Sequence, residues 1–224
     1  MGERGHAGQD RPILFSAPMV RALLDGRKTQ TRRILKPQPL GHVIHYGWQA
    51  EGGAFWTDQN FESRRIPFWT GDRLWVREAL ECANGEAIGY PADGTWFPND
   101  CWRWARKSLP SIHMPRAYSR LTLTVTNVRV QRLQEISADD AVAEGVTTTE
   151  FWRPKDVEGK PFEDKWWDDL TFWQNYPQIA FRALWESING TESWRANPWV
   201  AAYTFAVERR NIDAPTPTGE ASDV

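Results

Sequence analysis

The pattern of hydrophobic and polar positions predicts a helix close to the start of the chain. Four apolar residues between 19 and 24 recur at three- and four-residue spacing, which places them on one face of a helix over 17–25. Ser16 precedes this segment as an N-cap, and Pro18 falls in the first turn, where its missing N–H costs nothing. Gly26 supplies the C-terminal stop.

Extended patterns dominate the remainder of the chain. The strongest is 121–133, where a slip in the alternation predicts a bulge near Asn127. In 73–78, alternation points Leu74 and Val76 inward. The main segments predicted as extended are 12–15, 26–35, 73–78, 121–133 and 199–207.

Two further helices are indicated by their end signals. Ser137 caps the first, with Asp140 at its third position, Glu144 as its last residue and Gly145 closing it. The second ends with 181–188 and stops at Asn189-Gly190. Isolated helices among strands with mostly non-crossover connections predict an α+β fold, a small mixed or antiparallel β-barrel with short helices at its ends.

One domain over 11–208 is the simplest organisation for 224 residues. Three insertions are expected within it: a hairpin-bearing one at 41–70 that turns at Glu51-Gly-Gly53, and two more at 83–115 and 147–176. The polar ends, 1–10 and 209–224, are expected to be disordered tails.

Composition narrows the possible functions. Lys plus Arg number 27 against 29 Asp plus Glu, a net charge of -2, so any nucleic-acid site must be local. Cys82 and Cys101 are too few for a disulfide framework and predict free thiols in a reducing cytoplasm. No signal peptide or membrane span is expected. Without a dinucleotide, P-loop or zinc-protease motif, and with four scattered His, we expect no cofactor and no metal.

A basic stretch stands out at 21–36, where six Lys and Arg residues oppose only Asp25. At a turn from helix to strand, such residues could grip a phosphate or an anionic nucleotide. The alternative is a solvated edge strand whose charges prevent aggregation. Composition alone leaves these two interpretations evenly matched.

The motifs at this turn resemble those of the ASCH domain, a branch of the PUA-like barrels. Gly26-Arg-Lys28-Thr-Gln-Thr31-Arg-Arg33 is similar to the family signature GxKxx[E/T]xR. Gly71-Asp-Arg-Leu-Trp-Val-Arg77 resembles its GD turn and strand, and 136–146 resembles its short helix ending in Glu-Gly. With the terminal strand, these matches cover most of the chain outside the insertions. The opening segment and 184–200 resemble a subfamily of tailed phages and prophages, which implies the host cytoplasm.

The resemblance implies RNA or a modified base as the partner, and it also implies a metal-independent reaction. One ASCH enzyme deacylates N4-acetylcytidine with Lys, Thr and Glu, which fall here on Lys28, Thr31 and Glu144. Many members carry Glu at the Thr31 position, so Thr31 favours the catalytic kind. Arg33 is a candidate to hold carbonyl, sugar or phosphate oxygens. The predicted substrate-binding residues are Arg27, Arg32, Arg33 and Arg77.

This chemistry is also plausible from the residues themselves. Thr31 could attack an amide carbonyl if a base removed its proton, and Lys28 could be that base if burial and neighbouring Arg groups lowered its pKa. Glu144 could orient Lys28 or carry the proton to the leaving amine. The hypothesis requires the three residues to lie close together in the fold.

The first interpretation is therefore an amidohydrolase that acts on an acylated cytosine nucleoside or a related modified base. The alternatives are a non-catalytic module of phage origin that binds RNA or a modified nucleotide and, more weakly, a ribonuclease. Among the 14 Trp residues, Trp75 and Trp199 fit a core. Trp48, Trp56 and Trp69 are the better candidates to stack on a bound base. The sequence determines neither the substrate nor the oligomeric state.

Overall fold

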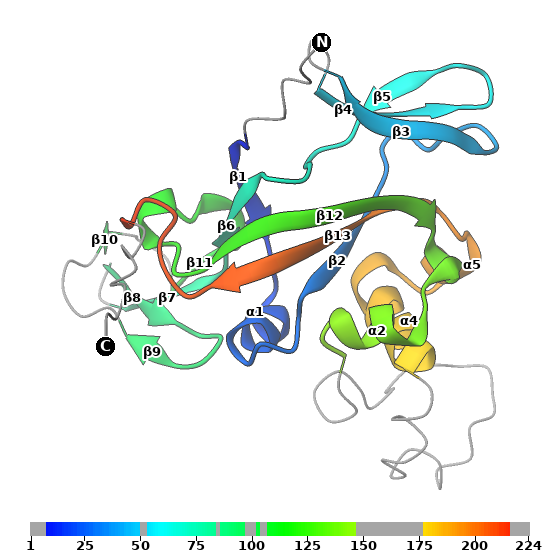
Figure 1. Cartoon of the computed structure of the whole chain (residues 1–224). Helices are drawn as coiled ribbons and strands as arrows, with labels where there is room; N and C mark the ends of the chain where they lie inside the picture. Colours follow the sequence, from blue (N-terminus) through cyan, green and yellow to red (C-terminus); the bar gives the residue numbers. More distant parts are fainter. Residues whose placement is uncertain are drawn as a thin grey trace, which may run out of the picture.

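The protein is an α+β structure in which strands predominate over short helices (Figure 1). The computed structural model describes residues 8–49, 53–83, 86–96, 102–103, 107–146 and 177–215. The predicted insertion at 147–176 lies outside these residues.

A five-stranded mixed sheet forms the centre of the molecule, in the order β1-β6-β12-β13-β2. β1 runs parallel to β6, and every other neighbouring pair is antiparallel. Its strands are β1 (Asp10–Leu14), β2 (Gln30–Ile34), β6 (Arg73–Arg77), β12 (Thr122–Arg132) and β13 (Trp199–Glu208).

The prediction of a closed barrel is wrong, because the central sheet is open. β1 and β2 are its two edges, and no strand pairing joins them within the described residues. The chain leaves β1 and enters α1 (Ala17–Leu24) directly, and the apolar face of α1 packs into the core with Phe15. The two edges are therefore connected by a packed helix rather than by a hydrogen-bonded ladder.

Two local predictions are confirmed in these elements. β12 and β13 pair along most of their length, and their register shifts between Val125 and Asn127, where the bulge was predicted. α1 ends at Leu24, and Gly26 follows with a positive φ of 73°. Ser16 is the N-cap residue, but its side chain makes no capping hydrogen bond, so Pro18 carries the local signal at that end.

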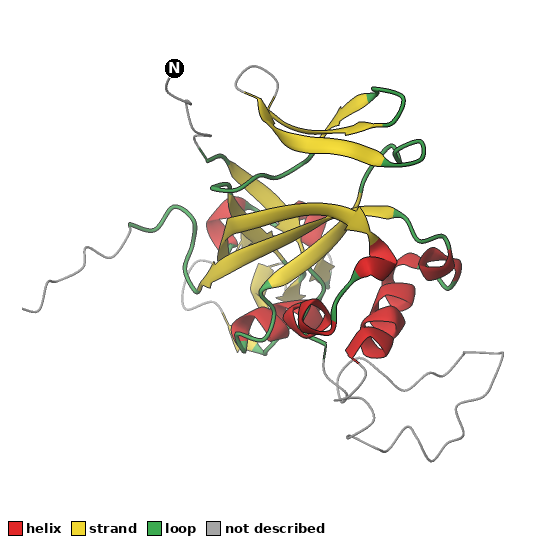
Figure 2. Ribbon diagram, turned by 45° about the vertical axis from the view of Figure 1, so that its right-hand side comes forward, coloured by secondary structure: helices red, strands yellow, loops and turns green. Residues whose placement is uncertain are grey.

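The remaining helices gather at one end of the central sheet and form a second apolar cluster. α2 (Ala138–Ala143), α4 (Pro177–Asn189) and the short α5 (Glu192–Arg195) lie together (Figures 1 and 2). Phe181 and Trp185 of α4 pack against Leu133, Ile136 and Val200. The Ser137 hydroxyl accepts a hydrogen bond from the Asp140 N–H, as predicted, whereas Glu144 is the C-cap of α2 rather than its last helical residue.

Two smaller sheets lie largely within the predicted insertions at 41–70 and 83–115, although β7 (Leu80–Ala83) of the second sheet begins before its insertion. The first contains β3 (Val43–Gln49), β4 (Gly53–Asp58) and β5 (Ser63–Arg65), so a third strand joins the expected hairpin. Part of its turn lies outside the described residues. The second sheet contains β7 (Leu80–Ala83), β8 (Glu86–Tyr90), β9 (Thr95–Trp96), β10 (Trp102–Arg103) and β11 (Ser108–Leu109). Single 3₁₀ turns cover 111–113, 116–118 and 133–135.

The described part of the predicted C-terminal tail is packed against the protein. Ile212 is buried, and the Asp213 carboxylate pairs with the guanidinium of Arg116 at 2.6 Å. The described part of the predicted N-terminal tail, 8–10, leads into β1, which begins at Asp10. Among the described residues, none of the helices combines the length and the apolar character that a membrane-spanning helix needs.

Candidate functional site

Lys28 and Glu144 meet where the approach to β2 passes the end of α2. Their backbones form an isolated antiparallel bridge, although the residues are 116 positions apart. Gly145 follows with a φ of +82°, and a Cβ there would lie 2.9 Å from the Lys28 Cβ and 3.0 Å from the Ala22 Cβ. Glycine is therefore required at 145 for both its conformation and its close contact with neighbouring side chains.

The two side chains form a buried ion pair. The Lys28 Nζ donates to Glu144 Oε2 and to the Glu144 carbonyl oxygen, both at 2.8 Å. Exposure is 0% for Lys28 and 3% for Glu144. Burial lowers the pKa of Lys28, and this effect exceeds the opposing one of the Glu144 charge and hydrogen bond. A buried lysine in this state is predisposed to give up its proton.

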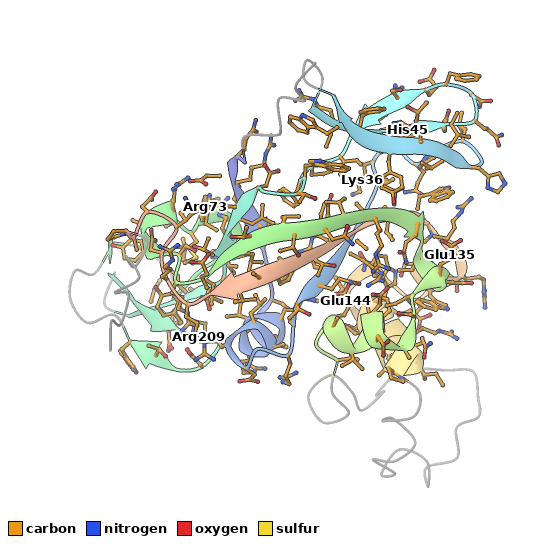
Figure 3. All side chains as sticks on the ribbon, in the orientation of Figure 1. Lys36, His45, Arg73, Glu135, Glu144 and Arg209 are labelled. Atoms are coloured by element: carbon orange, nitrogen blue, oxygen red, sulfur yellow. The ribbon has the colours of Figure 1, made fainter. Side chains whose placement is uncertain are left out.

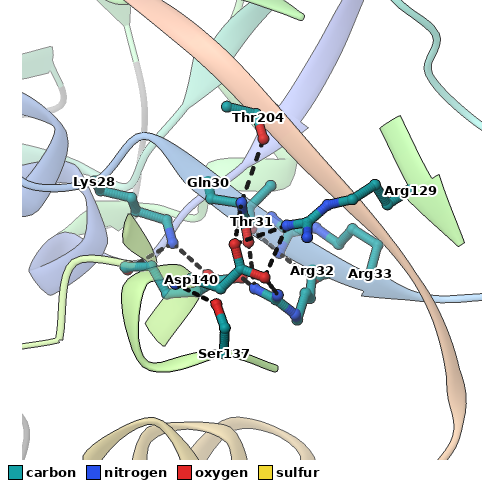
Figure 4. A network of polar contacts seen from close by, with 10 residues as sticks. Lys28, Gln30, Thr31, Arg32, Arg33, Arg129, Ser137, Asp140 and Thr204 are labelled. Atoms are coloured by element: carbon teal, nitrogen blue, oxygen red, sulfur yellow. Dashed lines mark hydrogen bonds and ion pairs between the residues drawn. The ribbon is translucent and has the colours of Figure 1, made fainter. Parts of the chain in front are cut away.

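Arg32 donates hydrogen bonds both to the second carboxylate oxygen of Glu144 and to Asp140 of α2. Its Nη1 donates to Glu144 Oε1 at 3.0 Å, and its Nη2 donates to Asp140 Oδ2 at 2.8 Å. Asp140 also accepts from Arg129 at 2.7 and 2.8 Å and from the Gln30 amide at 3.1 Å (Figure 4). Burial would raise the pKa of Asp140, but these hydrogen bonds and the Arg32 charge hold it below its usual value.

Thr31 and Arg33 lie on the other side of β2, because consecutive residues of a strand alternate between its two faces. Arg33 Nη1 donates to the Thr31 Oγ1 at 2.9 Å, and Nη2 donates to the Leu14 carbonyl at 2.9 Å. The Arg33 guanidinium also lies 5.1 Å from the centre of the Phe15 ring, and the Lys28 Nζ lies 5.7 Å from the same centre. Phe15 thus brings the two cations close to one another.

A cavity of about 380 Å³ opens beside these residues. Figure 3 shows Glu144 where the end of α2 approaches the central strands. Polar and charged side chains line one side of the cavity, and α1 and α4 supply most of the apolar side chains that line the rest. Its polar lining is Ser16, Thr31, Arg32, Arg33, Lys36, Glu144 and Asn189, and its apolar lining is Leu14, Met19, Ile34, Phe181, Leu184, Trp185 and Ile188.

The cavity collects four of the seven predicted site residues: Thr31, Arg32, Arg33 and Glu144. Lys28 is not part of the lining, but it lies directly behind Glu144. Thr31 and Glu144 therefore lie in one cavity with Lys28 behind Glu144, and Arg33, which contacts Thr31, approaches the same Phe15 ring as Lys28.

Two predicted substrate-binding residues lie elsewhere. Arg27 donates to the Gly145 carbonyl at 2.9 Å and pairs with Asp25, so it supports the turn after Glu144 without reaching the cavity. Arg77 lies over the Trp75 ring and donates to the Ile112 carbonyl. The prediction that Arg77 contacts the substrate is not supported, because its side chain extends along β6 toward a different loop.

Sequence reasoning missed two parts of this site. Asp140 was identified only as a capping position, and its pairing with Arg32 and Arg129 follows from tertiary contacts alone. The second part is the apolar wall that α4 contributes. Apolar residues at helical spacing around Leu184 indicate a buried helix face, but this pattern does not indicate that the face lines a cavity.

No model of a known protein family matches the chain, and neither a curated protein nor a solved structure matches it. Within the described ranges, no group of three or more His, Cys, Asp or Glu side chains is arranged to hold a metal ion. The strongest indications of function are therefore the geometry and charges of this cavity.

Proposed function

We propose that the protein is a metal-independent amidohydrolase of the ASCH type, with a PUA-like fold, that acts on an acylated cytosine nucleoside or a related modified base. One observation carries the proposal. Thr31 and Glu144 line the same cavity, and a buried lysine whose pKa is lowered contacts the Glu144 carboxylate at 2.8 Å. A hydroxyl, a carboxylate and an amine in this arrangement suit acyl transfer through a covalent intermediate.

In the first half of the reaction, the Thr31 Oγ1 attacks the carbonyl carbon of the exocyclic amide. The pair formed by Lys28 and Glu144 accepts the hydroxyl proton, and the carbonyl oxygen becomes an oxyanion. Arg33, which donates to the Thr31 Oγ1 at 2.9 Å, lies close enough to stabilise that charge. The bond between the carbonyl carbon and the amine nitrogen then breaks, and the leaving amine takes the proton from the same pair.

In the second half, water attacks the acyl ester on Thr31 and gives one proton to the pair formed by Lys28 and Glu144. The ester bond breaks, Thr31 recovers its proton, and the acyl group leaves as a carboxylate with release of a proton. The apolar wall from α4, with Trp185 and Leu184, would cover a base or acyl group while the charged side holds its polar atoms.

Binding without turnover is the second candidate, and one observation favours it. Within the described part of the chain, no hydrogen bond joins the Lys28 Nζ to the Thr31 hydroxyl, which instead accepts from Arg33. The cavity also presents Arg32, Arg33 and Lys36 against the single carboxylate of Glu144. An excess of cations suits a phosphate of RNA or of a modified nucleotide.

The deciding experiment follows release of cytidine from N4-acetylcytidine by chromatography. The wild type is compared with Thr31→Val and Lys28→Met, and Thr29→Val is the matched control two residues along the chain and outside the cavity lining. We expect turnover in the wild type and in Thr29→Val, and a loss of about a thousandfold or more in Thr31→Val, because a nucleophile cannot be replaced by a methyl group.

Two outcomes would count against an enzyme. If the folded wild type releases no cytidine from N4-acetylcytidine or from longer acylcytidines, the amidohydrolase proposal fails. If Thr31→Val retains wild-type turnover, Thr31 is not the nucleophile. Binding of the same nucleosides without turnover in the wild type would favour the second candidate.

A further inference from the structure

A second cavity of about 170 Å³ lies between the start of β1 and the three-stranded sheet of β3, β4 and β5. Figures 1 and 2 show this small sheet and the helices α2 and α4 on opposite sides of β12 and β13. The second cavity shares no lining residue with the first. Its lining is Gln9, Arg11, Trp48, Gly53, Ala54, Arg65, Ile66, Pro67, Phe68, Trp69 and Asp72.

Aromatic side chains from two segments form its walls. Trp48 comes from β3, and Phe68 and Trp69 come from the loop before β6. All three are half-buried and pack against the main core. Phe68 is held edge-on against the Tyr203 ring, with 5.3 Å between the ring centres. Of the three Trp residues predicted to stack on a base, Trp56 is instead buried in the core at 1% exposure.

The loop that carries these aromatic residues is fixed by Asp72. Its carboxylate accepts the backbone N–H of Trp69 at 2.8 Å through one oxygen and that of Gln9 at 2.8 Å through the other. This links the start of β1 to the aromatic loop. A wall held in place before a ligand arrives loses less conformational freedom on binding.

Two arginines bring positive charge to the same cavity. Arg65 is exposed on β5, and its Nη2 lies 3.8 Å from the position of a Cβ on Gly53, where the Trp48 ring approaches to 3.7 Å. Arg11, on β1, donates through Nη2 to the Gln9 side chain. Its Nε is buried, and no hydrogen-bond partner for this atom is found among the described residues. Arg65 and Arg11 outnumber the one carboxylate in the lining.

We propose that this second cavity binds a nucleotide, with the base against the aromatic side chains and the phosphate against Arg65 and Arg11. Flat aromatic walls stack on any base, and guanidinium groups bind phosphate oxygens in pairs of hydrogen bonds. The volume is below the about 300 Å³ typical of pockets for larger ligands, so it holds one ring, and the phosphate lies at the exposed rim near Arg65. The nucleotide is either free or part of a single-stranded RNA.

The test measures the affinity of a fluorescein-labelled hexacytidylate and of cytidine monophosphate for the full chain. Arg65→Ala is compared with Arg64→Ala, its neighbour on β5, which is exposed and outside the cavity lining. Trp48→Ala is compared with Trp96→Ala, an exposed tryptophan on β9. We expect Arg65→Ala and Trp48→Ala to weaken binding about tenfold, as loss of a phosphate contact or of one stacked base does, and both controls to bind within about twofold of the wild type.

The salt dependence separates the two kinds of contact. We expect Arg65→Ala to lower the slope of log affinity against log salt by about 0.7, and Trp48→Ala to leave the slope unchanged. If both probes bind with similar affinity, the ligand is a free nucleotide, and if only the hexacytidylate binds, it is a nucleotide within RNA.

Three outcomes overturn the proposal: neither probe binds, Arg64→Ala weakens binding as much as Arg65→Ala, or neither Arg65→Ala nor Trp48→Ala weakens it. Arg65 is exposed, so its variant keeps the test valid if Trp48→Ala fails to fold. The proposal does not depend on the amidohydrolase activity. Thr31→Val, which abolishes the proposed turnover, should leave hexacytidylate binding at Arg65 within about twofold of the wild type.

Discussion

The two cavities of this protein place their charges in different environments. Beside β2, Lys28, Arg32 and Glu144 are buried, and each contacts an opposite charge within 3.0 Å. Beside β5, Arg65 is exposed at the rim, and aromatic rings form much of the walls. The first cavity depends on a network in which each charge needs its neighbour. The second combines aromatic surface with cations that remain in contact with solvent.

This difference has energetic consequences. Buried charges lose their hydration, so removing one partner leaves the other uncompensated in a medium of low dielectric constant. An exposed arginine is already hydrated and screened, so its removal changes the binding of a ligand much more than it changes folding. Variants in the two regions should therefore separate stability from binding.

The largest effect is expected for Glu144→Gln. This change leaves Lys28 buried without a carboxylate and Arg32 with Asp140 as its remaining carboxylate partner, and we expect the free energy of unfolding to fall by about 3 to 5 kcal/mol in urea denaturation. The control is Glu192→Gln, whose exposed pair with Arg195 should contribute less than about 1 kcal/mol. Equal losses in the two variants would show that the buried network is no more sensitive than a surface pair.

A smaller loss is expected for Asp140→Asn, because Asp140 supports Arg32 from outside the ion pair with Glu144. The variant weakens charged hydrogen bonds to Arg32 and Arg129, and we expect about 1.5 to 3 kcal/mol of destabilisation. Asp139→Asn is the matched control, since it lies in the same first turn of α2 and is exposed. Asp139→Asn should cost about 0.3 to 1 kcal/mol through the helix dipole. If Asp139→Asn lost as much stability as Asp140→Asn, this would contradict a positioning role for Asp140.

The pH dependence of stability tests the state of Lys28. Its folded pKa is lowered below the usual 10.5, so between the folded and unfolded pKa values the unfolded chain binds more protons. The free energy of unfolding of the wild type, relative to that of Lys28→Met, should therefore rise as the pH increases toward 10.5. Its slope should be at most about 1.4 kcal/mol per pH unit. Denaturation at several pH values above 7 measures this slope. A flat difference throughout that range would mean that burial does not lower the pKa of Lys28.

The smallest effect is expected for Arg65→Ala on folding. Because its side chain is exposed at the second cavity, we expect the free energy of unfolding to change by less than about 0.5 kcal/mol, measured by thermal denaturation. A larger loss would mean that Arg65 holds the small sheet together, and weaker nucleotide binding by this variant would then have a structural cause.

Several local signals in the sequence were reliable because they depend on the backbone of a few neighbouring residues. Gly26 ends α1 and Gly145 follows α2, both with positive φ, and the bulge lies where the alternation of β12 slips near Asn127. These features depend on the sterics of a few consecutive residues, so the one-dimensional pattern contains the necessary information. The third strand of the small sheet, β5, has only three residues and no such pattern.

Signals that depend on distant partners were less reliable. Trp56 and Trp69 looked alike in the sequence, yet one is fully buried and the other lines a cavity. Arg77 was grouped with Arg33 as a predicted substrate-binding residue, yet Arg33 donates to Leu14 at the end of β1 and Arg77 donates to Ile112 in a 3₁₀ turn. Residue type indicates what a side chain can do, whereas its surroundings come from segments far away in the chain.

The sequence by itself determined the class of the fold, most of the central strands, the ends of α1 and the candidate residues Lys28, Thr31 and Glu144. The tertiary structure alone decided that the sheet is open, that Asp140 supports Arg32, and that α4 forms the apolar wall of the cavity. The physical reason is range. Backbone sterics and hydrophobic periodicity act over a few residues, but a buried charge finds its partner across 116 positions, as Lys28 does with Glu144.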